Sequence, residues 1–198
     1  MASIKQKFLL WSLLLVSIWI VSKSLVPAGR DPLAPNGSAL AMRGRNLLTL
    51  LAERGMVTNA VDAVSIASSD HFLRTVLDGV PDQLDWAFDK EGCLWNVALH
   101  VDADSDADFP VLISANLNPA ALVKGSCPIE LGPQAGASRS LLDDRAVVVV
   151  RMGGHAQVIK KDRLSVFSVF PIEKDKLPRN IEYLTPIGIC RVSIGGVK

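Results

Sequence analysis

The stretch "VVVVRMGGHAQVIKKDRL", Val147–Leu164, indicates the fold more clearly than any other part of the chain. Four valines lead into Gly153 and Gly154, and a second apolar run follows His155. β-Branched residues on both sides of a glycine pair are typical of a β-hairpin. The sequence predicts a two-residue turn in which both glycines have positive φ, with Met152 opposite His155.

This register decides how His155 is interpreted. The side chain lies at the exposed end of the hairpin, and the sequence places no acid or nucleophile beside it. A histidine without a motif partner is weak evidence for a site. We therefore interpret Gly153, Gly154 and His155 as a structural turn, and we predict no catalytic residue.

Two helices are predicted ahead of this hairpin. "SALAMRGRNLLTLLAERG", residues 38–55, has leucines at helical spacing after a capping residue, Ser38. "SSDHFLRTVLDG", residues 68–79, begins at Ser68 or Ser69 and ends at Gly79.

The other segments favour β structure. "CLWNVALHVD" and "PVLISANL" are strand-like, and "LSVFSVF" fits a half-buried strand or an extended segment. Pro186 and Gly188 interrupt the tail, residues 181–198, so its β character stays open. Helices precede strands without the βαβ alternation of a parallel sheet. The sequence therefore predicts an α+β fold with an antiparallel sheet.

The N-terminus contains the main apolar segment. Lys5 and Lys7 precede an uncharged run, Phe8–Val21. This pattern fits either a retained membrane anchor or a cleaved signal peptide with its cut near "VPA", residues 26–28. Both export the rest of the chain. The predicted organisation is an anchor or signal segment (1–28), a Pro/Gly linker (29–37) and an exported α+β domain (38–198).

Charge and cysteine content narrow the function classes. With 21 basic and 20 acidic residues, no strong field favours nucleic acid. Cys93, Cys127 and Cys190 allow one disulfide and one free thiol outside the cytoplasm, and the sequence does not choose the pair. Three buried thiols are the alternative. No zinc-ligand spacing is present.

The segment "HVDADSDADFP" contains the candidate metal ligands. Asp102, Asp104, Asp106 and Asp108 lie at alternate positions, and carboxylate oxygens are the ligands that calcium prefers. The spacing departs from an EF-hand, because Ala107 stands where that loop needs glycine. A calcium loop and a solvated loop between two strands both remain open. No other cofactor is predicted.

The layout also suggests a family. An apolar N-terminus, the helical stretch "ALAMRGRNLLTLLAERG" and the late hairpin with its Gly-His pair resemble divergent type IV pilin-like proteins, in particular type II secretion pseudopilins. "KQKFLLWSLLL" lacks the usual prepilin signal motif, with no glycine before Phe8 and no glutamate after it. The resemblance implies an N-terminal apolar membrane helix, then a helix or two packed on an antiparallel sheet.

The same resemblance implies a function. It predicts a membrane-tethered, non-catalytic structural subunit whose C-terminal domain lies in the periplasm or at the cell surface, with the membrane and other pilin-like subunits as partners. Two alternatives stay open. One is an anchored or secreted binding module that uses residues 102–108, and the other is an exported hydrolase without a recognisable motif.

Overall fold

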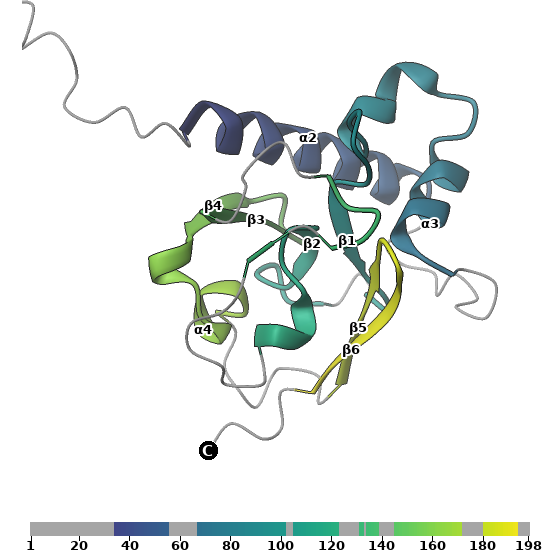
Figure 1. Cartoon of the computed structure of the whole chain (residues 1–198). Helices are drawn as coiled ribbons and strands as arrows, with labels where there is room; N and C mark the ends of the chain where they lie inside the picture. The colour runs from purple at the N-terminus through teal and green to yellow at the C-terminus, as the bar shows by residue number, and fades with distance from the viewer. Residues whose placement is uncertain are drawn as a thin grey trace, which may run out of the picture. The chain divides into compact units, whose positions relative to one another are not determined.

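Figure 1 shows the chain as a computed structural model. It describes residues 34–55, 67–101, 105–122, 131–132, 134–138, 145–171 and 180–193. All of these except Ala34 belong to one compact unit, Pro35–Lys198. The N-terminal apolar segment, residues 1–28, lies outside the described residues.

The centre of this unit is a six-stranded antiparallel sheet with the order β4-β3-β2-β1-β5-β6 (Figure 1). The strands are β1 (Trp95–Ala98), β2 (Pro110–Ser114), β3 (Ala146–Arg151), β4 (Ala156–Lys160), β5 (Asn180–Thr185) and β6 (Gly188–Ser193). β3 is buried at all six positions. Burial on both faces explains why its sequence is a continuous valine run instead of an alternating one.

The strand register assigns side chains to the two faces of the sheet. Val97 pairs with Leu112, and Leu112 pairs with Val150, so these three side chains share one face. Tyr183 and Arg151 occupy alternate positions and therefore face the opposite side.

Helix α2 (Ala34–Glu53) packs on the Val97 face. Its buried apolar stripe consists of Leu40, Leu47, Leu48, Leu50 and Leu51. Gly44 brings the helix close to the sheet: a Cβ atom at this position would lie 2.6 Å from both Trp95 Cη2 and Val150 Cγ2. The glycine that weakens helical propensity in the sequence is therefore required by packing.

The first turn of α2 lies over the β4 edge of the sheet. A Cβ atom on Gly37 would lie 3.0 Å from Val158 Cγ2. The helix begins at Ala34, so the prediction that Ser38 caps it is wrong. Pro35 explains the earlier start, because a proline fits the first helical turn, where its missing N–H has no acceptor anyway.

Helix α3 (Ser69–Val76) packs beside α2 on the same face. The Ser68 side chain accepts a hydrogen bond from the His71 N–H, which confirms Ser68 as the cap. The Arg54 guanidinium, just beyond α2, donates to the carbonyl of Val76. The 3₁₀ helix η1 (Pro81–Trp86) follows, and the Trp95 indole N–H donates to the Trp86 carbonyl at 2.7 Å.

The opposite face is covered by η2 (Pro119–Leu122) and α4 (Val166–Val169). The prediction that residues 164–170 form a strand is wrong. Ser165 and Ser168 form a reciprocal capping box that starts α4. The short 3₁₀ helix η3 (Lys161–Arg163) joins β4 to this region.

The predicted fold class needs one correction. The antiparallel sheet of an α+β fold is present, but no helix in the described ranges is long and apolar enough to cross a membrane. The longest described helix, α2, is amphipathic, because leucines face the sheet while Arg45 and Glu53 are exposed. The described fold is helix α2 followed by a six-stranded antiparallel sheet. The expected membrane helix falls on residues 1–28, outside the described residues.

Candidate functional site

The β3–β4 connection is a three-residue loop instead of the predicted two-residue turn. The strands pair one residue away from the predicted register, with Val149 opposite Gln157. Gly154 N donates to Arg151 O at 2.9 Å, and Arg151 N donates to His155 O at 2.8 Å. Together with φ +81 at Gly154, these bonds define a turn that ends in a G1 bulge.

The two glycines of this loop have different roles. Only Gly154 has positive φ, so the prediction of positive φ at both positions is wrong. A Cβ atom on Gly153 would lie 3.2 Å from the Cβ and the carbonyl oxygen of Ala107, and Gly153 N donates to that oxygen at 2.8 Å. Position 153 is therefore a glycine because its backbone lies against Ala107 in the loop before β2.

The three histidines lie on separate parts of the fold. His155 is exposed at the end of the β3–β4 loop, and His71 is exposed in the first turn of α3. His100 follows β1 with φ +56, and its Nε2 lies 3.5 Å from Glu182 Oε2. Within the described part of the chain, no group of three or more His, Cys, Asp or Glu side chains could hold a metal ion.

The described half of the aspartate segment is organised by backbone contacts. Asp106 Oδ1 accepts a hydrogen bond from Asp108 N at 2.8 Å, and Phe109 N donates to Asp106 O at 2.8 Å. Both of these aspartates are exposed. Asp102 and Asp104 lie outside the described residues, so the calcium loop stays a prediction.

Arg151, which the sequence reasoning did not single out, is a buried cation at the end of β3. Its side chain is held by oxygen atoms from three segments: Asp108 O (2.8 Å), Val169 O (2.9 Å), Ser168 O (3.0 Å) and Gln157 Oε1 (3.2 Å). Burial lowers the pKa of the guanidinium, while the negative charge of Asp108 acts in the opposite direction. Arg151 therefore fastens α4 and the loop before β2 to the sheet.

Asn96 is a second polar residue that the sequence reasoning missed. Its side chain is fully buried in β1, and Nδ2 donates to Leu117 O at 2.8 Å and to Ser114 O at 3.3 Å. These bonds shape the chain after β2. A polar residue inside an apolar strand pattern was the available signal.

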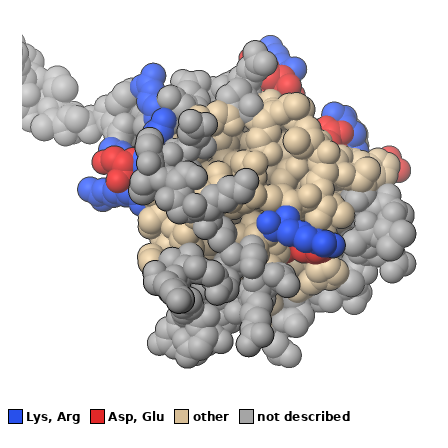
Figure 2. Space-filling view, turned by 60° about the horizontal axis from the view of Figure 1, so that its bottom comes forward, with Lys and Arg blue, Asp and Glu red and all other residues tan. Residues whose placement is uncertain are grey.

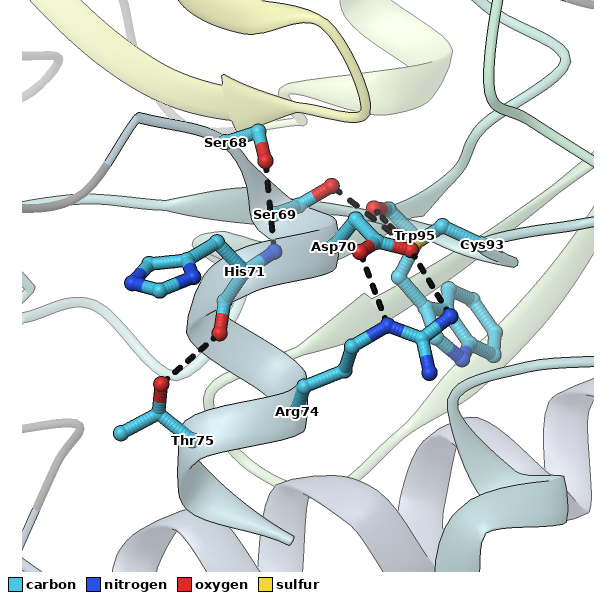
Figure 3. A network of polar contacts seen from close by, with 8 residues as sticks. All are labelled: Ser68, Ser69, Asp70, His71, Arg74, Thr75, Cys93 and Trp95. Atoms are coloured by element: carbon cyan, nitrogen blue, oxygen red, sulfur yellow. Dashed lines mark hydrogen bonds and ion pairs between the residues drawn. The ribbon is translucent and has the colours of Figure 1, made fainter. Parts of the chain in front are cut away.

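Cys93 is the centre of the polar network in Figure 3. Its Sγ donates to Trp95 O at 3.5 Å and lies 3.6 Å from Ser69 Oγ. Beside it on α3, Arg74 Nε donates to Asp70 Oδ2 at 2.9 Å. Burial raises the pKa of the Cys93 thiol, which opposes the thiolate form that a nucleophile requires. This network therefore joins α3 to β1 and does not activate the thiol.

The cysteine alternatives are partly resolved. Cys93 and Cys190 are both free thiols, and Cys127 lies outside the described residues. Burial also raises the pKa of Cys190, whose Sγ lies 3.6 Å from Asn118 Oδ1.

Among the described residues, three large apolar side chains are more than 60% exposed, and Met42 on α2, at 61%, is one of them. Phe167 on α4, near β4, is 69% exposed, and Ile187 at the β5–β6 tip is 65% exposed. Figure 2 shows a face on which charged side chains lie mostly at the margin, including a mixed group on the side where Figure 1 places β4 and α4. Exposed Lys160, Lys161 and Arg163 belong to that edge.

Comparisons with protein-family models, with curated proteins and with solved structures gave no match. The function must therefore be argued from the chain itself. Within the described residues, the histidines lie apart, burial raises the pKa of the Cys93 thiol, and four protein oxygens accept hydrogen bonds from the Arg151 side chain.

Proposed function

We propose that this chain is a non-catalytic structural subunit of the pilin-like class. In this proposal residues 1–28 tether it to a membrane, the domain lies outside the cytoplasm, and other pilin-like subunits are its partners. The N-terminal segment with its flanking lysines supports the tether.

The observation that carries the proposal is the contact between α2 and the sheet. The chain passes from the N-terminal segment through a short linker into α2. The helix then meets the sheet at two glycines, Gly37 over Val158 and Gly44 over Trp95. Interiors packed this closely transmit displacement. A load on the tether would therefore reach the whole domain, as a structural subunit requires.

Fractionation of the full-length chain tests this proposal. We expect it in the membrane fraction, together with pilin-like chains that mass spectrometry identifies after mild solubilisation. Recovery of the uncleaved chain from the aqueous fraction would overturn the tether. A membrane-bound chain that copurifies with no pilin-like protein would overturn the structural role.

A matched pair of variants tests the α2 contact itself. Gly44→Val forces a side chain against Trp95 and Val150, and overpacking of this kind costs about 1–3 kcal/mol. We expect this variant to stay in the membrane but to lose partners. Gly132→Ala is the control, because a Cβ atom there meets nothing within 4 Å. Equal partner recovery for both variants would show that assembly does not depend on the packing of α2 against the sheet.

A further inference from the structure

We draw no further inference here: the strongest candidate, the edge of the sheet at strand β6 with the exposed apolar side chains of Ile187 and Ile189, carries none, because nothing in the described part of the chain shows what covers it.

Discussion

The hairpins β3–β4 and β5–β6 lie at the two edges of the sheet. Three residues form the first turn, and two residues, Pro186 and Ile187, form the second, because Thr185 pairs with Gly188. A glycine with positive φ ends the first turn and follows the second, Gly154 at +81 and Gly188 at +154. β3 is buried throughout, whereas Ile187, Ile189 and Arg191 of the second hairpin are exposed. The two hairpins therefore differ in turn length, and they differ more strongly in burial.

This difference explains why one hairpin is visible in the sequence and the other is not. Burial of β3 on both faces selects valines, which mark a strand strongly. In the sequence, Pro186 and Gly188 interrupt the tail, so the pattern alone does not assign a strand there. In the structure Pro186 begins the turn, where its fixed φ is favourable, and Thr185 Oγ1 donates to Gly188 O at 2.9 Å.

The largest expected effect separates the two hairpins through their arginines. Arg151→Met removes the donor from buried carbonyls, each of which costs about 1–3 kcal/mol when left unsatisfied, so we expect a loss of order 3 kcal/mol. Arg191→Met removes an exposed ion pair with Glu182, worth less than about 1 kcal/mol. Urea unfolding of both variants measures the difference. Equal losses would refute the assignment of Arg151 as the buried fastening residue.

The glycines give the next effect and test how similar the turns are. Gly188→Ala and Gly154→Ala place a side chain at positive φ, which costs about 1–3 kcal/mol. Gly153→Ala has ordinary φ, but its new Cβ atom would lie 3.2 Å from the Ala107 carbonyl oxygen, so we expect a loss of about 1 kcal/mol, smaller than that of Gly154→Ala. Thermal unfolding ranks the three. A Gly153→Ala loss as large as that of Gly154→Ala would show that the contact with Ala107 costs as much as a side chain at positive φ.

The sequence predicts features that depend on neighbouring residues. Ser68 caps α3 through a hydrogen bond three residues away, and the valines mark β3 by their own preference for strands. The capping box of Ser165 and Ser168 was equally local, but the alternation of apolar and small residues suggested a strand instead.

Features set by distant contacts were not predictable in this way. The need for glycine at position 153 comes from Ala107, and the role of Arg151 comes from carbonyls 17 to 43 residues away. A pattern in one sequence describes neighbouring residues and does not show which distant residues come into contact.

A smaller effect is expected at alkaline pH, where Tyr183 of the β5–β6 hairpin should make the free energy of unfolding depend on pH. Burial raises the pKa of Tyr183 in β5 well above its ordinary value of 10.0, and its hydroxyl donates to Pro110 O at 2.7 Å. The folded state keeps this proton after the unfolded chain has lost it. The contribution is therefore complete below pH 10 and is lost as pH rises beyond it.

The test follows unfolding free energy from pH 8 upward. Tyr183→Phe should flatten the decline above about pH 10. Cys93→Ser should instead flatten the part of the decline that begins near pH 9, because burial raises the pKa of the Cys93 thiol above its ordinary value of 9.0. A decline that Tyr183→Phe leaves unchanged would contradict the role of β5 in alkaline unfolding.

The smallest effect is expected at His155. Its side chain is exposed, and the contact that ties the residue to the hairpin is made by its backbone carbonyl, which accepts from Arg151 N at 2.8 Å. His155→Ala keeps that carbonyl, so unfolding free energy should change by less than about 0.5 kcal/mol. Neighbouring Gly154→Ala is the internal comparison, since it alters the backbone of the same loop and should cost more. Partner recovery should also match that of the unchanged chain. If His155→Ala removed partners while unfolding stayed the same, His155 would be a contact residue and the interpretation of this loop as purely structural would be wrong.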